Sequence, residues 1–309
     1  MFRPSDLLML AVIFGSIALG IFVPSFGRLF DGAPLWCMMA VLYISFLSIR
    51  LVDVWEILGR DFVQVMYFAA IKLVALPVAI FALFSVVLPE YALAALLLSG
   101  ISTGVVSVFF AGLVQANAPL VLVMIVVTSL LVPFTLPTLV ILLAGKMISI
   151  PFVAMARLLG LVIFVPILVA ELTHRFAPAL GARIRHRQQP ISLVLFAATN
   201  LGVFARYSDF LRERPETLLT AVLVGVALAA GYFVLGLVCA WSLAVAEKLA
   251  FIIGFAIMNN ILVVVFATQF FSPLEPTVAA MYTIPFFSMI LPLRLYRHRH
   301  PVGNREDTQ

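Results

Sequence analysis

Charged side chains are scarce in this sequence: Asp, Glu, Lys and Arg make up 11% of its 309 residues, whereas soluble domains average about 25%. Hydrophobic residues make up 64%, and the mean hydropathy is +1.19. Apolar stretches of about 17 to 25 residues are long enough to cross a bilayer. The composition therefore excludes an ordinary soluble protein and predicts an all-α, polytopic integral membrane protein.

Cysteine and histidine are also scarce. Cys37 and Cys239 fall within expected spans, so we interpret them as packing residues and not as a disulfide. All four histidines lie in arginine-rich segments between or after spans, which argues against a metal site. The sequence contains no nucleophile elbow, phosphate loop or paired acids. We predict that the protein is not an enzyme, binds no metal and carries no cofactor.

Ten segments are apolar enough to span the membrane. They are residues 7–26, 34–51, 62–88, 91–116, 119–145, 151–171, 190–208, 217–245, 248–271 and 274–296. We treat the chain as a single transmembrane domain. Repeat one covers about 1–148, repeat two covers about 149–300, and a short tail covers 301–309.

The two halves share a plan. In each half, polar residues interrupt the fourth segment and two prolines lie in the fifth. Ser107 and Asn259 are separated by 152 residues, as are Pro133 and Pro285. Because five is an odd number of spans, we expect the second half to be inverted in the membrane relative to the first. Secondary transporters use this inverted-repeat design, with the binding site where the two broken helices cross.

The first interruption is the segment from Ser99 to Ser107, which contains two glycines and four hydroxyl residues. A broken helix survives in hydrocarbon only when it is buried in protein or lines a cavity. Its free N–H groups and positive dipole end can bind an anion. We therefore predict that Ser102, Thr103, Gly104 and Ser107 bind substrate. The alternative is a close helix contact made by small residues.

The second interruption is Met258-Asn259-Asn260. Two adjacent carboxamides in an apolar helix have unmet hydrogen-bonding demand. We predict that Asn259 and Asn260 also belong to the substrate site, with one serving the protein and the other the ligand. The alternative is that one caps a half-helix and the other bonds a neighbouring helix.

Lys72 is the most unusual residue of the third span. It lies eleven residues past Asp61, which is about 16 Å into the bilayer on a helix. A lysine at that depth costs about 2.5 to 3.5 kcal/mol, so a partner is expected. Pro77 is expected to kink the helix and free a carbonyl beside it. The alternative, snorkelling of Lys72 to an interface, requires a long reach.

Positive charge is distributed unequally between the two sides. Of the nineteen Lys and Arg, twelve fall on the side of the N-terminus and six on the other, and Lys72 is embedded. This bias places both termini in the cytoplasm, and we expect the inner membrane of a bacterium. The basic stretch from Thr173 to Gln189 is expected to be a loop that fixes topology, with anionic lipid contact as a secondary role. We predict no nucleic-acid partner.

The sequence resembles the bile acid:sodium symporter family, within the group that includes arsenite and auxin exporters. The resemblance covers nearly the whole chain, most specifically residues Lys72 to Pro77, Ser107 to Pro137 and Phe255 to Pro273. It implies ten helices, with spans 1, 2, 6 and 7 forming a panel and the others a core in which helices 4 and 9 cross. It also implies an organic-anion substrate, usually carried inward with sodium.

The sodium ligands implied by this family are mostly replaced. The positions of the first site hold Ser107, Val108, Val121 and Ile125. The glutamate shared by both sites falls at Phe255, which removes the anionic ligand that a hard cation prefers. At the second site Lys72 and Asn259 stand where the family has glutamines.

We hypothesise that the Lys72 ammonium replaces a sodium ion, facing carbonyls around Ala256 and Met258 beside Asn259. The protein is then a sodium-independent secondary transporter of a small organic anion that works by alternating access. No acid lies at mid-membrane, which argues against carboxylate-based proton coupling. Several alternatives stay open. Lys72 releases its proton in each cycle, or it stays charged as the counter-ion of the substrate. The protein is a sodium- or proton-coupled symporter, or a non-transporting receptor or scaffold. Oligomeric state is not predicted.

Overall fold

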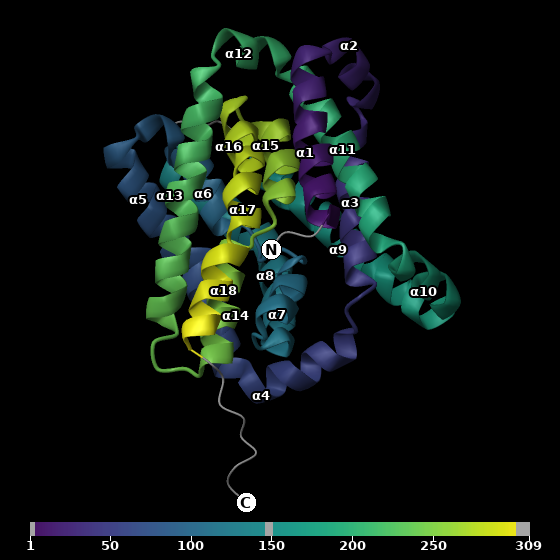
Figure 1. The fold of residues 1–309 in the computed structure, drawn as a ribbon, viewed down its shortest axis with the longest axis vertical. Helices are drawn as coiled ribbons and strands as arrows, with labels where there is room; N and C mark the ends of the chain where they lie inside the picture. The colour runs from purple at the N-terminus through teal and green to yellow at the C-terminus, as the bar shows by residue number, and fades with distance from the viewer. Residues whose placement is uncertain (1–3, 146–150, 301–309) are drawn as a thin grey trace, which may run out of the picture.

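The computed structural model describes residues 4–145 and 151–300, and these ranges consist of helices and short connections (Figure 1). In this part of the chain, five helices are long and apolar enough to cross a membrane. The number is six if Ala11–Phe22 and Pro24–Phe30, which are bent by 108°, form one span. The protein is therefore an all-helical membrane protein, as predicted, while the count of ten spans stays a prediction.

Twelve helical elements precede residue 146. They are α1 (Pro4–Phe22), α2 (Pro24–Gly27), η1 (Arg28–Phe30), α3 (Ala33–Phe46), α4 (Leu51–Ala70), η2 (Ile71–Ala75), α5 (Leu76–Val87), η3 (Pro89–Tyr91), α6 (Ala92–Gly100), α7 (Ser107–Val114), α8 (Ala118–Leu139) and η4 (Val140–Ala144). Here η1 and η3 are 3₁₀ turns, whereas η2 and η4 are π-helical turns.

Ten helices follow. They are α9 (Phe152–Phe176), α10 (Pro178–His186), α11 (Gln188–Arg206), α12 (Ser208–Glu213), α13 (Glu216–Cys239), α14 (Val245–Ala256), α15 (Asn260–Phe270), α16 (Leu274–Met281), α17 (Thr283–Ser288) and α18 (Ile290–Arg299). Each of the ten apolar segments falls on one or more of the described helices. The segments that do not pass as full spans are bent, broken, shorter or more polar.

The helices form two contacting groups. In one group, α11 packs against α1 and α3, and α3 packs against α9; α1, α3 and α11 lie on the right of Figure 1. The other group contains α4 to α8 and α13 to α17, with α4 and α14 against α8, α13 against α14, and α15 against α16. Contacts of α15 with α3, α9 and α11, and of α8 with α9, join the groups. Buried apolar side chains continue across both.

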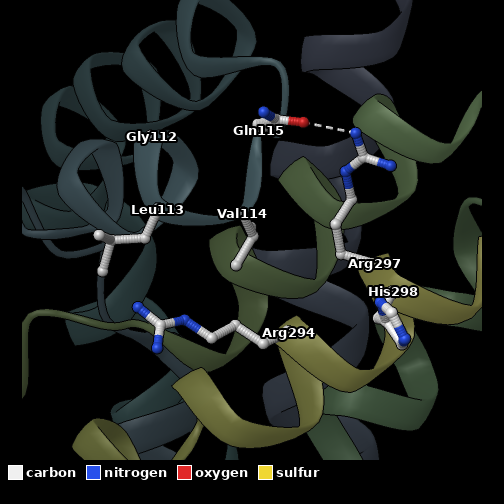
Figure 2. Close-up of a pocket in the computed structure, with 7 residues that line it drawn as sticks. All are labelled: Gly112, Leu113, Val114, Gln115, Arg294, Arg297 and His298. Carbon is white, nitrogen blue, oxygen red and sulfur yellow. Dashed lines mark hydrogen bonds between the residues drawn. The ribbon is translucent and has the colours of Figure 1, made fainter. Parts of the chain in front are cut away.

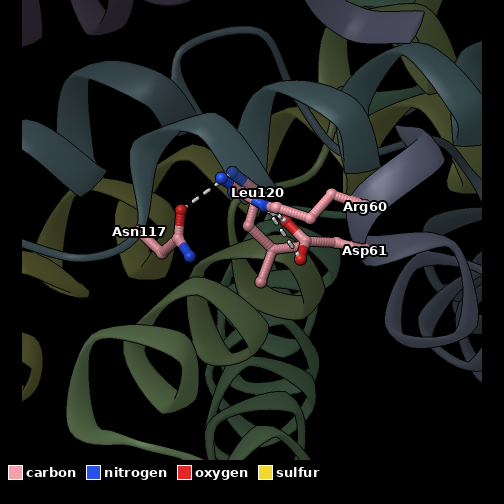
Figure 3. Close-up of polar contacts among 4 residues, drawn as sticks. All are labelled: Arg60, Asp61, Asn117 and Leu120. Carbon is pink, nitrogen blue, oxygen red and sulfur yellow. Dashed lines mark hydrogen bonds and ion pairs between the residues drawn. The ribbon is translucent and has the colours of Figure 1, made fainter. Parts of the chain in front are cut away.

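Two charged stretches between predicted spans, residues 52–61 and Thr173 to Gln189, are helical where loops are expected. Residues 52–61 lie in α4, whose non-helical Asp61 (φ −109°, ψ 23°) separates this part from the apolar part. The Arg60 guanidinium binds the Asp61 carboxylate at 3.0 Å (Figure 3). The stretch from Thr173 to Gln189 contains the end of α9, α10 and the start of α11. The loop predictions were wrong because charge does not break a helix: Arg, Lys and Glu are good helix formers.

Proline disturbs the third span, but by a π-turn and not by a simple kink. Pro77 lies in the first turn of α5, directly after the π-turn η2, in which the Leu76 N–H bonds the Ile71 carbonyl. A π-turn shifts the hydrogen-bond register by one residue, which accommodates the missing proline donor. Lys72 lies in this turn and is fully buried. The last span, Leu274–Arg299, consists of α16, α17 and α18 in direct succession, with Pro285 in α17.

Asn117 caps α8, a position at which asparagine is strongly preferred. The Leu120 N–H donates to its Oδ1 at 3.1 Å (Figure 3), which satisfies one of the free donors at the start of the helix. The Asn117 N–H donates to the Ala246 carbonyl at 3.0 Å. The junction of α7 and α8 is thereby joined to the start of α14.

Candidate functional site

The two predicted helix breaks are present and contact each other. The chain is extended between α6 and α7 and again between α14 and α15. Thr103 and Met258 form an antiparallel bridge between these segments. The Gly104 N–H donates to the Ile257 carbonyl at 2.8 Å, and the Asn259 N–H donates to the Ser102 carbonyl at 3.0 Å. Backbone groups that each break leaves unpaired are therefore satisfied by the other break.

Gly104 permits this close approach. A Cβ atom at Gly104 would lie 2.7 Å from the carbonyl oxygen of Met258 and 2.9 Å from its carbonyl carbon. Both atoms are backbone, so no flexible side chain can move aside. The two segments pair at this distance only because residue 104 lacks a side chain.

The carboxyl end of α14 concentrates acceptors. A helix leaves its last four carbonyl groups without an internal partner. The Gly254 carbonyl accepts from the Thr103 hydroxyl at 2.9 Å, and the Phe255 carbonyl accepts from the Lys72 ammonium at 3.4 Å. The Ala256 carbonyl accepts from the Tyr282 hydroxyl at 2.8 Å, and the Ile257 carbonyl accepts from the Gly104 N–H at 2.8 Å. The Ser107 hydroxyl also donates to the Ile257 carbonyl at 2.8 Å. Three of these four carbonyls have neutral donors, and one has a cation.

Lys72 is the cation in this set, and its side chain has an exposed fraction of 0%. Its Nζ lies 5.5 Å from the centroid of the Tyr232 ring on α13. Among the described residues, no carboxylate lies within salt-bridge distance of it. The negative end of the α14 dipole and the face of an aromatic ring both favour a positive charge at this place. Burial of the whole side chain rules out snorkelling in this conformation.

The carbonyl groups predicted as partners of Lys72 are engaged by other donors. Its hydrogen bond goes to Phe255, one residue before Ala256. The Ala256 carbonyl accepts from Tyr282, and the Met258 carbonyl accepts from the Asn260 N–H at 3.0 Å. The break in α14 and α15 therefore lies beside Lys72, as expected, but a different carbonyl of that break binds the ammonium.

Phe255 occupies the position where the family resemblance implies a shared glutamate. Its side chain is fully buried, and its ring lies 4.7 Å from that of Phe68 and 6.4 Å from that of Phe251, centroid to centroid. An aromatic cluster is therefore present where an ion ligand is implied. Within residues 4–145 and 151–300, no group of three His, Cys, Asp or Glu is positioned to hold a metal ion.

The two asparagines have different surroundings. Asn259 caps α15: its Oδ1 accepts from the Leu262 N–H at 3.3 Å. It is half-buried, and its Nδ2 has no partner in the described part of the chain. Asn260 is buried, and its Nδ2 donates to the Ala279 carbonyl at 3.3 Å and to the Thr283 hydroxyl at 3.0 Å. Asn260 serves the protein, whereas Asn259 keeps a free amide group.

The hydroxyl residues divide in the same way. Thr103 donates its hydroxyl to α14, and its N–H donates to the Thr128 hydroxyl at 3.1 Å. Ser107 is also engaged. The hydroxyl of Ser102 is buried and has no hydrogen-bond partner among the described residues. Of the side chains predicted to bind substrate, those of Ser102 and Asn259 therefore have unused hydrogen-bonding capacity.

Sequence reasoning missed Tyr232, as well as Thr128 and Tyr282, whose hydroxyl groups bond the two breaks. The ring of Tyr232 lies over Lys72, and its side chain is fully buried. It carries the only hydroxyl group between Thr220 and Ser242. An isolated hydroxyl in a long apolar span is a signal that the sequence offers, although it does not identify the partner.

A helical membrane protein in which two interrupted helices pair at their breaks has the site architecture of a membrane transporter. The model of the Sodium Bile acid symporter family matches residues 35–214, more than half of the chain, and the chain belongs to that family. This confirms the predicted family and indicates a membrane transporter, since members of the family are transporters and not enzymes. The matched range includes Lys72 and Ser102 and ends before Tyr232 and Asn259. No curated protein matches the chain.

Proposed function

We propose that the protein is a secondary transporter that moves an organic anion across the membrane without sodium, because the Lys72 ammonium takes the place of a sodium ion. The observation that carries this proposal is the contact of a fully buried ammonium with a free carbonyl at the end of α14. An ammonium brings one positive charge and three donors. It thus meets the electrostatic demand of four clustered carbonyl dipoles without an added cation.

The substrate binds at the opposite, electropositive side of the same crossing. The first residues of α7 and α15 both lie at the breaks, and the positive end of a helix dipole attracts anions. The unpaired hydroxyl of Ser102 and the unpaired amide of Asn259 supply two further groups. A carboxylate of a small organic acid has the acceptors to use them.

Alternating access requires two bodies that move around the site. In this proposal α1, α3, α9 and α11 form the panel, and the remaining spans form a core of inverted repeats. The order of elements supports this division, because each half contains a broken helix followed by a proline-containing span. The excess of Lys and Arg on the side of the termini favours cytoplasmic termini.

Uptake into proteoliposomes tests the proposal. Wild type, Lys72→Gln and Lys248→Gln are assayed with a panel of organic anions in sodium, in potassium, and with an imposed pH gradient. Lys248→Gln is the matched control, since Lys248 lies in the first turn of α14 and away from the crossing. We expect sodium-independent uptake by wild type and by the control. Lys72→Gln loses uptake or gains a requirement for sodium.

Strong sodium dependence of wild type contradicts the proposal. Uptake driven by the pH gradient in wild type and lost in Lys72→Gln assigns Lys72 to proton coupling instead. If no anion is transported, a second function gains weight: a receptor or scaffold that kept the fold. The observation in its favour is Phe255, whose buried ring occupies the position where the family resemblance implies an ion ligand.

A further inference from the structure

A second group of positive charges lies far from the crossing, between the end of α7 and α18. A pocket of about 420 Å³ opens there. Its lining is formed by residues 112–115 on one side and by Arg294, Arg297 and His298 on the other (Figure 2). None of the described residues that line this pocket carries a carboxylate.

The arginines of the pocket have unused donors. Arg294 makes no hydrogen bond or ion pair with any described residue, and its guanidinium lies on the Leu113 side of the pocket (Figure 2). Arg297 donates to the side chain of Gln115 and to the His300 carbonyl, but its Nε is buried without a partner. The two guanidinium groups lie on different sides of the pocket, Arg294 near Leu113 and Arg297 beside Gln115 (Figure 2), and an anion in the pocket offsets their positive charge.

Gln115 holds one side of the pocket in place. It ends α7 in the left-handed conformation, with φ 54° and ψ 41°. Among the described residues it is the only one other than glycine with a positive φ. Its side-chain oxygen accepts from Arg297. The Arg297 guanidinium is thus oriented before any ligand arrives, which reduces the entropy lost on binding.

The position of the pocket along α18 indicates the source of an anion. Leu291 and Leu295 are 56% and 52% exposed, and at helical spacing they share a face with Arg294 and His298. An exposed apolar face that continues into basic residues is typical of the boundary between acyl chains and headgroups. A ligand at Arg294 that is also in contact with Leu291 and Leu295 has a charged head and an apolar tail.

We propose that this pocket binds a phosphate oxyanion, supplied by the headgroup of an anionic lipid. Arg294 makes a bidentate contact to the phosphate, the geometry for which a guanidinium is suited. Arg297, held by Gln115, adds a second positive charge at the pocket, while the acyl chains lie along Leu291 and Leu295. This site is independent of the transport proposal, because it uses none of the residues at the crossing.

The test measures lipid retention by native mass spectrometry and thermal stabilisation in detergent. The probes are dioctanoyl phosphatidylglycerol, the zwitterionic dioctanoyl phosphatidylcholine, and inorganic phosphate. The variants are Arg294→Gln, Arg294→Lys and Arg299→Gln. Arg299 is the matched control, since it is exposed on the same helix and outside the pocket. Thermal unfolding without added lipid checks that every variant is folded.

We expect wild type and Arg299→Gln to bind phosphatidylglycerol in preference to phosphatidylcholine. In Arg294→Gln the affinity falls about tenfold or more, and Arg294→Lys retains part of it. Stabilisation by inorganic phosphate alone that also depends on Arg294 supports the phosphate site with a soluble anion as its source. Equal losses in Arg294→Gln and Arg299→Gln overturn the proposal, as does the absence of any loss in Arg294→Gln.

Discussion

The two helix breaks both leave backbone groups without partners inside their helices, but they differ in length and in the groups they supply. The first, between α6 and α7, contains six residues and supplies mainly donors, from Thr103 and Gly104, to which Ser107 at the start of α7 adds its hydroxyl. The second, between α14 and α15, contains three residues and supplies mainly acceptors. The shorter break leaves the four final carbonyls of α14 clustered, and their partial negative charges add. Lys72, the only fully buried cation in the described ranges, contacts this break.

From this difference we infer that hydrogen bonds from neutral donors stabilise the crossing, whereas the Lys72 ammonium neutralises the partial negative charge of the α14 carbonyls. Substitutions at the crossing separate these two roles through their effects on the free energy of unfolding, measured by equilibrium unfolding in mixed SDS and detergent micelles.

Gly104→Ala has the largest expected effect. The added Cβ meets the Met258 carbonyl group at 2.7 to 2.9 Å, so the two breaks must separate. We expect a loss of about 2 to 3 kcal/mol in the free energy of unfolding, the upper part of the range for overpacking. The matched control is Gly231→Ala on α13, because a Cβ there meets nothing within 4 Å. Equal effects of the two substitutions contradict the close pairing of the breaks.

Thr103→Val is expected to cost about 1 to 2 kcal/mol, because the Gly254 carbonyl loses its side-chain donor inside the membrane. Ser107→Ala is the comparison. It is expected to cost less than about 0.5 kcal/mol, since the Ile257 carbonyl keeps its bond from the Gly104 N–H. If Ser107→Ala lowers the free energy of unfolding more than Thr103→Val does, the Ser107 hydroxyl and not the Thr103 hydroxyl is the more important donor to α14.

Lys72→Met is expected to change the free energy of unfolding by less than about 1 kcal/mol. The Phe255 carbonyl loses its partner, but the substitution also removes the desolvation cost of a buried ammonium, and the two effects oppose each other. Uptake of the organic anion is nonetheless lost. A destabilisation as large as that of Gly104→Ala indicates instead that Lys72 fastens the crossing.

Asn259→Ser is expected to have the smallest effect on stability, within about 0.5 kcal/mol, because serine also caps helices well. Uptake falls, since the substitution removes the free Nδ2 group that is proposed to contact substrate. Asn117→Ser is the matched control: Asn117 makes the same type of cap on α8, away from the crossing. Unchanged uptake by Asn259→Ser removes Asn259 from the substrate site.

Local chemistry explains which features the sequence predicted. The apolar length of its segments predicts membrane helices, and the glycines and hydroxyl residues around Gly104 predict the first break. The preference of asparagine for helix amino ends predicts the cap at Asn117. The depth of Lys72 along its span predicts a buried cation that needs a partner. Each of these inferences depends on residues within a single apolar segment and its ends.

The sequence by itself determined the membrane character of this protein, the positions of both helix breaks and the burial of Lys72. Only the tertiary structure decided that Lys72 binds the Phe255 carbonyl, 183 residues away, that Asn260 and not Asn259 bonds a neighbouring helix, and that Arg294 faces the end of α7 (Figure 2). The physical reason is that a hydrogen bond or a pocket between distant segments depends on how helices pack, and packing places several equally suitable acceptors within reach of one donor.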